Sequence, residues 1–112
     1  MSGLAQQQCN EVPYASQALT MEQAKKYIKQ LDPVWQLDED HRYISHSYDF
    51  NDYYQTMACA NVIAQIAHQQ DHHPELQLSY RRCIVTYSTH SVNGLSIKDF
   101  ICAAKINAAQ TL

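Results

Sequence analysis

Apolar side chains recur with helical spacing in the first third of the chain. They fall at i, i+3, i+4 and i+7, which is one face of an amphipathic helix. Thr20 precedes the stretch and Gln23 lies three residues further on, the pattern of a capping box. Pro33 disfavours helical geometry in the residue before it, so we predict a helix over 21–31. Its buried face carries Ala24, Tyr27, Ile28 and Leu31.

A longer stretch with the same spacing occupies the middle of the chain. Asn51 or Asp52 can cap its start. Its end is set by Pro74, which disfavours helical geometry at His73, so the helix should stop near His72. The doubled histidine is therefore expected at a helix C-terminus. The predicted buried face carries Tyr53, Met57, Ala60, Ile63, Ala64, Ile66 and Ala67.

The third helical stretch lies near the C-terminus. Asn93-Gly94 is a turn signal, and Ser96 can cap the helix that follows. This helix should run to about Ala109. Its apolar face carries Ile97, Ile101, Ala104 and Ala108.

Between the helices the apolar period shortens toward two, which is typical of strands. The segment from Trp35 to Phe50 contains two such runs, separated by the acidic turn 38–40, and this predicts a β-hairpin. Two further runs, Gln77 to Tyr80 and Cys83 to His90, predict a second hairpin with a short turn at residues 81 and 82.

The predicted order of elements is α-β-β-α-β-β-α. Hairpins favour an antiparallel sheet, and each amphipathic helix needs one face covered. We therefore expect an α+β fold in which three helices pack on one face of a four-stranded antiparallel sheet. Residues 1–17 are polar, rich in glutamine and without a period, so we expect a flexible arm there and a single domain over 18–112.

Composition narrows the function classes. The chain has 112 residues, which suits one domain, and a net charge of −3 without a basic stripe, so nucleic acid is not expected as a ligand. No run is long and apolar enough for a membrane span and no basic-apolar leader is present, so we expect a cytoplasmic protein. The cysteines lack the paired spacing of a zinc ribbon or disulfide framework and are expected to be reduced, mostly buried thiols. They are Cys9, Cys59, Cys83 and Cys102.

Histidines are the main chemical candidates. His72 and His73 stand next to each other between Asp71 and Pro74, and His90 ends the last strand-like run. Imidazole titrates near neutrality, so such a group can take and return protons at cellular pH. The sequence thus indicates acid/base chemistry or a metal site.

Structural explanations compete with these functional ones. A protonated histidine at a helix C-terminus interacts favourably with the helix dipole. Asp99 can form a capping box with Ser96, and Trp35 taken alone fits a core position. His41 and His46, on the first predicted hairpin, fit a solvated surface.

A zinc site is the alternative to acid/base chemistry. His68 and His72 form an i, i+4 pair, which can bind zinc when both lie on one helix face. The chain lacks a His-Glu-x-x-His motif around this pair, so we expect no metal.

The order and spacing of these motifs resemble those of the pterin-4a-carbinolamine dehydratase family, from about Thr20 to the C-terminus. Two positions depart from the family pattern: His68 stands where an acidic residue is common, and Leu76 where an aromatic residue often follows the Pro-Glu. The resemblance is carried by Asp71-His72-His73-Pro74-Glu75, Tyr80, Ser88-Thr89-His90, Gly94-Leu95-Ser96, Asp99, Trp35 and the aromatic stretch 48–53.

The resemblance implies an enzyme that removes water from a 4a-hydroxytetrahydropterin, in recycling of the tetrahydrobiopterin used by an aromatic amino acid hydroxylase. It implies catalysis by His72, His73 and His90, with no cofactor or metal, because the pterin is the substrate. Substrate contacts are expected from Pro74, Trp35 and Asp99. A homodimer or homotetramer is expected. The alternative is a non-enzymatic dimerisation or coactivator-type partner in transcription, although scaffolding alone would not need the histidines.

Overall fold

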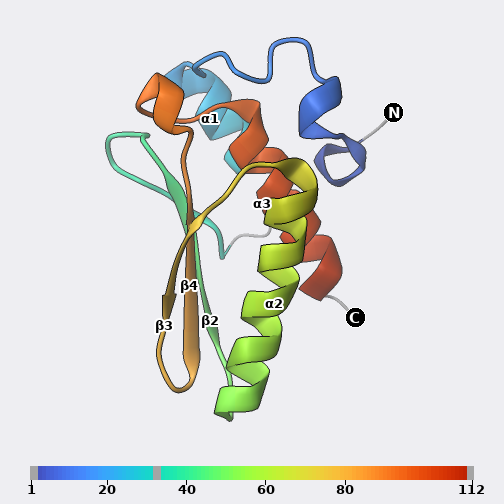
Figure 1. The fold of residues 1–112 in the computed structure, drawn as a ribbon. Coiled ribbons are helices and arrows are strands. Elements are labelled where there is room, and N and C mark those ends of the chain that lie inside the picture. Colours follow the sequence, from blue (N-terminus) through green and yellow to red (C-terminus); the bar gives the residue numbers. More distant parts are fainter. Residues whose placement is uncertain (1–2, 32–33, 111–112) are drawn as a thin grey trace.

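The structure is a computed structural model that describes residues 3–31 and 34–110. Helices and strands occur in the predicted order (Figure 1). The helices are α1 (Met21–Ile28), α2 (Tyr53–Gln70) and α3 (Ile97–Gln110). The strands are β1 (Gln36–Leu37), β2 (Ile44–Asp49), β3 (Glu75–Leu78) and β4 (Arg82–Tyr87). Short 3-10 helices are η1 (Leu4–Gln6), η2 (Cys9–Glu11) and η3 (His90–Val92).

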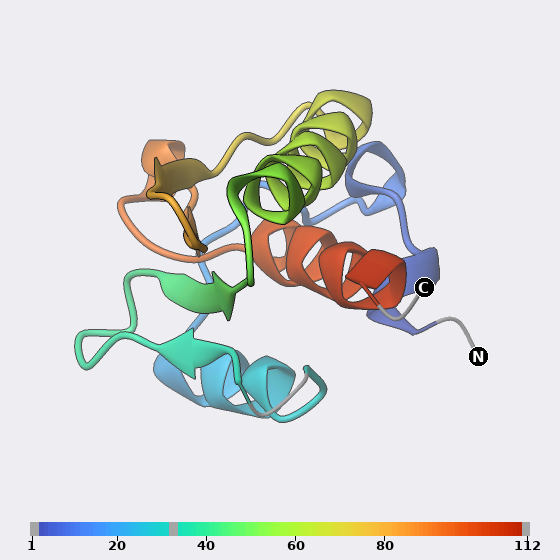
Figure 2. The ribbon, with the colours of Figure 1, turned by 90° about the horizontal axis from the view of Figure 1, so that it is seen from below.

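The strands form one antiparallel sheet in the order β1-β2-β4-β3. Both α2 and α3 lie on the same side of this sheet, and α1 lies beside β1 (Figure 2). The Tyr27 ring of α1 packs against the Phe100 ring of α3, with centroids 5.4 Å apart. Alternate strand residues point toward the helices, so Ile44, Val85 and Tyr87 are buried in the core. The α+β class and the helix-covered antiparallel sheet are confirmed.

Helix ends follow local signals. Thr20 and Gln23 form the predicted capping box, with bonds of 3.1 and 2.9 Å between each side chain and the other's backbone N–H. The helix α1 ends at Ile28, earlier than expected, because 29–31 close into tight turns. Pro33, which was expected to set this end, lies outside the described residues.

The second hairpin differs from the prediction at both strands. Its turn spans 79–81 and is closed by a 2.9 Å bond from the Ser79 N–H to the Arg82 carbonyl, so β3 ends at Leu78 instead of Tyr80. The strand starts at Glu75 instead of Gln77, because Glu75 pairs with Thr86 of β4. At the other end, β4 stops at Tyr87. His90 therefore lies in η3 and not on a strand, because a bridge between Thr89 and Gly94 folds the chain back there.

The N-terminal segment 3–17 packs against the fold, in contrast to the flexible arm that we expected. Leu4 and Cys9 are buried, and η1 and η2 contact α3 (Figure 1). The Lys105 ammonium donates to the Ala5 carbonyl at 2.8 Å, and the Gln70 amide oxygen accepts from the Cys9 N–H at 2.9 Å. Isolated apolar residues among glutamines make these contacts, which explains why the pattern showed no period.

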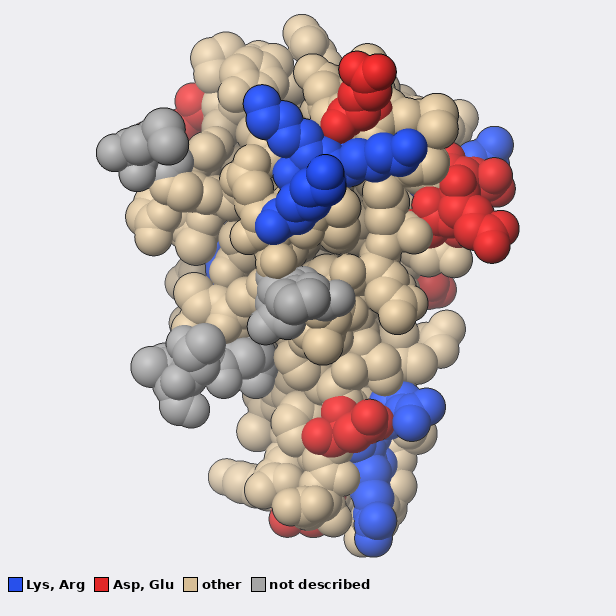
Figure 3. Space-filling model, turned by 180° about the vertical axis from the view of Figure 1, so that it is seen from behind, with Lys and Arg blue, Asp and Glu red and all other residues tan. Residues whose placement is uncertain are grey.

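On the face in Figure 3, Lys and Arg side chains form separate groups with Asp and Glu near them, and no continuous basic stripe is visible. The four cysteines, all within the described ranges, are free and buried. Among the described residues, no helix combines the length and the apolar character needed to cross a membrane.

Candidate active site

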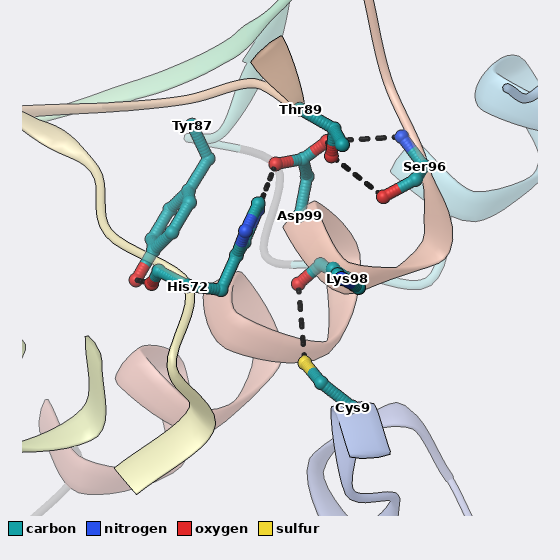
Figure 4. A network of polar contacts seen from close by, with 7 residues as sticks. All are labelled: Cys9, His72, Tyr87, Thr89, Ser96, Lys98 and Asp99. Carbon is teal, nitrogen blue, oxygen red and sulfur yellow. Dashed lines mark hydrogen bonds and ion pairs between the residues drawn. The ribbon is translucent and has the colours of Figure 1, made fainter. Parts of the chain in front are cut away.

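Asp99, in the first turn of α3, is the centre of a buried polar network (Figure 4). Its side chain is fully buried, and Oδ2 accepts from the Thr89 hydroxyl at 2.9 Å and from the Ser96 N–H at 3.0 Å. The other oxygen, Oδ1, lies 2.6 Å from Nε2 of His72. The Ser96 contact is one half of the predicted capping box. Buried carboxylates need such donors, because an unpaired buried charge is very costly.

His72 is held in one orientation by its surroundings. The helix α2 ends because Asp71 adopts the left-handed conformation, with φ of 50°, and the His72 N–H then bonds to the Ala67 carbonyl at 3.1 Å. The imidazole stacks on the Tyr87 ring, with centroids 5.3 Å apart and planes at 19°. The Tyr87 hydroxyl donates to the His72 carbonyl at 3.2 Å. With 12% of its side chain exposed, His72 still reaches the surface.

The pairing with Asp99 determines the tautomer of His72. An ionised carboxylate can only accept hydrogen bonds, so Nε2 must carry a proton. In the neutral ring, Nδ1 is then the nitrogen that can take a proton. A carboxylate on the far nitrogen also stabilises the imidazolium that would form.

His90 is linked to the same network through its neighbour. It is exposed and follows Thr89, whose hydroxyl binds Asp99. Backbone bonds between Thr89 and Gly94, one of them 2.7 Å long, hold the turn that carries His90. The two oxygens of Asp99 thus join His72 to the segment that bears His90.

A cleft of about 510 Å³ opens beside this segment. Glu75 and Thr86, paired across β3 and β4, lie on the face of the sheet opposite the buried residues. Exposure alternates from His72 to Gln77, which places His73 on the same side as Glu75. His90 lines the cleft, whereas His72, which stacks on the buried Tyr87, and His73 are not among the residues that line it. The cleft is lined by Arg42, Tyr43, Glu75, Gln77, Thr86, Ser88, Thr89, His90, Asn93 and Gly94.

Several of these residues were missed by sequence reasoning. Arg42 and Tyr43 come from the β1–β2 connection, and Gln77 comes from β3, so only the folded sheet brings them to one place. Thr89 belongs to the Ser-Thr-His motif, but its residue type alone indicates no role in the site. A small polar residue directly before a candidate histidine was the one available signal.

Other predicted site residues lie elsewhere. Trp35 is buried and donates from Nε1 to the Asn107 side chain at 2.7 Å. Asn107 lies about 12 Å along α3 from Asp99, at 1.5 Å per residue. The structure therefore places Trp35 in the core, since its indole ring fills the space beside the C-terminal half of α3. Pro74 is half-buried between His73 and Glu75.

The helical His68–His72 pair is not formed. His68 is exposed in the last turn of α2, whereas His72 follows the left-handed residue that ends the helix. The two imidazoles therefore do not lie on one helix face, as a zinc-binding i, i+4 pair would require. No group of three or more His, Cys, Asp or Glu side chains in 3–31 and 34–110 is arranged to hold a metal ion. His46, expected at the surface, is half-buried against Trp35 and Tyr48 because it is on the helix-facing side of β2.

Two buried groups next to the network have shifted pKa values. A hydrogen bond with Cys102 lowers the pKa of Cys9 from 9.0 to about 7, with help from the charges of His72, Lys98 and Lys105, while burial opposes the shift. Burial is the main cause that raises the pKa of the Tyr87 hydroxyl, so this group remains protonated. The Cys9 thiol lies 3.9 Å from the Lys98 carbonyl (Figure 4).

Comparisons with known proteins match almost the entire chain. The model of the family described as pterin 4 alpha carbinolamine dehydratase matches residues 17–109. The chain belongs to this family. A protein of Nitrosomonas eutropha, provisionally named a pterin-4-alpha-carbinolamine dehydratase, is 43% identical over 93% of this chain and 90% of its own length. A Bdellovibrio bacteriovorus protein with the same name is 52% identical over 82% of this chain and 78% of its own.

The fold agrees with a solved member. The crystal structure of a transcriptional coactivator/pterin dehydratase from Brucella melitensis matches with a TM-score of 0.75 and 34% identity. The match covers 80% of this chain and 95% of that one. Family membership, predicted from the motifs around the doubled histidine, is confirmed.

Proposed function

We propose that this protein dehydrates a 4a-hydroxytetrahydropterin to the quinonoid dihydropterin by histidine acid/base catalysis. Family membership supports the dehydratase class. The observation that carries the mechanism is the Asp99 carboxylate, which joins His72 to the Thr89–His90 segment beside a cleft of about 510 Å³.

The reaction needs two proton transfers. The bond between the 4a carbon and its hydroxyl oxygen breaks as the electrons of the neighbouring ring nitrogen form a C=N bond. One group gives a proton to the departing hydroxyl, which leaves as water. Another group takes the proton from that ring nitrogen. Each general acid or base is typically worth about 10² to 10⁴ in rate.

The geometry suggests how the histidines divide these roles. His72 suits the base, because Asp99 holds the proton on Nε2 and stabilises the imidazolium formed when Nδ1 takes a proton. His90, exposed and lining the cleft, suits the acid. His73, on the Glu75 side of the chain, would hold the pterin and share proton transfer. Pro74 would shape the adjacent wall.

The proposed setting is recycling of a tetrahydropterin cofactor for an aromatic amino acid hydroxylase in the cytoplasm. The pterin is the substrate, so no further cofactor is required. We also propose a homodimer or homotetramer. Exposed aromatic side chains on α2, among them Tyr53 and Tyr54, favour burial of this helix in an assembly.

The direct test measures the dehydration rate of preformed carbinolamine, after subtraction of the uncatalysed rate. Wild-type protein should accelerate the reaction, and His72→Ala and His90→Ala should each lower kcat at least about tenfold. The matched control is His68→Gln, which removes an exposed imidazole from α2 and should retain activity within about twofold. Unchanged rates in both alanine variants would reject the mechanism.

A second candidate function is that of a dimerisation partner in transcription. It is favoured by the description of the Brucella melitensis relative as a coactivator as well as a dehydratase. This role would not need the histidines. If it were the sole function, the wild-type protein would not speed dehydration, and His72→Ala would leave partner binding unchanged.

A further inference from the structure

Thr89 and Ser96 form a hydroxyl pair behind the Asp99 carboxylate. Their oxygens lie 2.6 Å apart, and the Thr89 hydroxyl lies 2.9 Å from Oδ2 of Asp99. Thr89 is 4% exposed, and Ser96 and Asp99 are 0% exposed. Bulk water therefore does not compete for these hydrogen bonds, and their directions are set by the protein (Figure 4).

The number of hydrogens available fixes which group donates in each bond between Ser96, Thr89 and Asp99. Ionised Asp99 only accepts, so the single hydroxyl hydrogen of Thr89 points to Oδ2. Thr89 must then accept from the Ser96 hydroxyl across their 2.6 Å contact. On the other side of the carboxylate, Nε2–H of His72 donates to Oδ1. The chain runs from Ser96 through Thr89 to Asp99, and Asp99 fixes the proton on His72.

We propose that Thr89 is a positioning residue that acts through Asp99 on the tautomer and orientation of His72. This inference rests on the proposed function, in which Nδ1 of His72 moves the proton. Thr89 also precedes His90 and occupies the N-cap position of η3, where its side chain makes no capping bond. The same residue therefore ties the candidate acid to the candidate base, and its hydroxyl is the part that acts on His72.

A purely structural role makes a different prediction. If the Thr89 hydroxyl only satisfies a buried carboxylate, its loss should lower stability and leave the His72 tautomer unchanged. If it holds the carboxylate for His72, its loss should also change the protonation of the ring. Nitrogen chemical shifts of ¹⁵N-labelled histidine distinguish the two tautomers and follow the titration, without any need for activity. His72→Gln identifies the signals.

The experiment compares Thr89→Val, which keeps the side-chain shape, with Thr89→Ser, which keeps the hydroxyl. We expect Thr89→Val to lower kcat about tenfold, the typical effect of losing one hydrogen bond to a charged group, with KM within about twofold. In this variant only the Ser96 N–H still holds Oδ2, so the carboxylate should turn and Oδ1 should leave Nε2 of His72 for part of the time. The His72 signals should then show a mixture of the two neutral tautomers. Thr89→Ser keeps the hydroxyl, so its kcat should lie within about threefold of wild type. Its His72 signals should show the same tautomer as wild type.

The matched control is Thr56→Val. The Thr56 hydroxyl is equally buried and bonds to the Asp52 and Tyr80 carbonyls near the start of α2, away from the network. Its loss should lower stability without moving the His72 signals. If Thr89→Val lowers kcat and leaves the His72 tautomer and titration as in wild type, the positioning role is wrong.

Two further measurements keep the test decisive. Should Thr89→Val not fold, Ser96→Ala removes the donor to Thr89 and keeps the Ser96 N–H bond to Asp99. A shift of the His72 signals in Ser96→Ala supports the chain, and unchanged signals reject it. Should wild-type protein lack dehydratase activity, the proposed function fails, while the His72 signals of the variants still decide whether the hydrogen-bond chain exists.

Discussion

Replacing Asp99 by asparagine changes the charge at the centre of the network while keeping its shape. Every neighbour of Asp99 in the network presents a hydrogen: the Thr89 hydroxyl, the Ser96 N–H and Nε2–H of His72. An amide has one oxygen and two N–H hydrogens. With its oxygen toward Thr89 and Ser96, its NH2 group faces His72. The ring must then accept at Nε2, so its proton moves to Nδ1 and blocks the proposed base.

The expected cost follows from the bonds lost. A hydrogen bond to a charged group contributes about 1.5–3 kcal/mol, which corresponds to a fall in kcat of about 10- to 150-fold. KM should change much less, because Asp99 is fully buried and does not line the cleft. The imidazolium that forms during proton transfer would also lose its carboxylate partner, so the upper part of this range is expected.

The assay combines dehydration kinetics with urea unfolding and histidine NMR. Urea unfolding shows whether Asp99→Asn is folded at the assay temperature, and NMR reports the His72 tautomer. The reasoning would be refuted by a folded Asp99→Asn variant that shows the inverted tautomer and keeps kcat within about twofold, since 1.5 kcal/mol or more should have been lost.

Other predictions concern pH, metal and assembly. Because the folded-state pKa of Cys9 is lowered to about 7, its contribution to stability is full above its unfolded value of 9.0 and is lost as pH falls through 7. Cys9→Ser should abolish this rise in unfolding free energy between about pH 7 and 9, and a rise equal to that of wild type would contradict the lowered pKa. Exhaustive chelation should leave full activity, and activity lost on chelation and restored by zinc would make metal chemistry the leading mechanism. Sedimentation at micromolar concentration should show a closed homo-oligomer, and monomer alone would contradict the proposed assembly.

Regular elements of this fold were predictable because their signals are local. The capping box at Thr20, the cap at Asp52 and the apolar faces of the helices depend on residues a few positions apart. The ends of the second hairpin were less predictable. The turn 79–81 and the Thr89–Gly94 bridge depend on backbone bonds that carry no side-chain period, so the sequence pattern predicts β3 two residues late and predicts a strand at His90.

The candidate site was predictable only as a set of residue types. Motif order singled out His72, His90 and Asp99, but nothing in their spacing shows that Oδ1 of Asp99 meets Nε2 of His72. Such pairings depend on how α3 packs on the sheet. The same packing decides that Trp35 meets Asn107 in the core, and that isolated apolar residues near the N-terminus dock on α3.

The central claim is that His72 and His90 act together on one substrate, and a double-mutant cycle tests it most directly. Dehydration rates of His72→Ala, His90→Ala and the double variant are compared with wild type. Groups that act as a unit are strongly non-additive, so we predict that the double variant loses less than about tenfold beyond the slower single variant. Losses that multiply in full would contradict the account, because the histidines would then act independently.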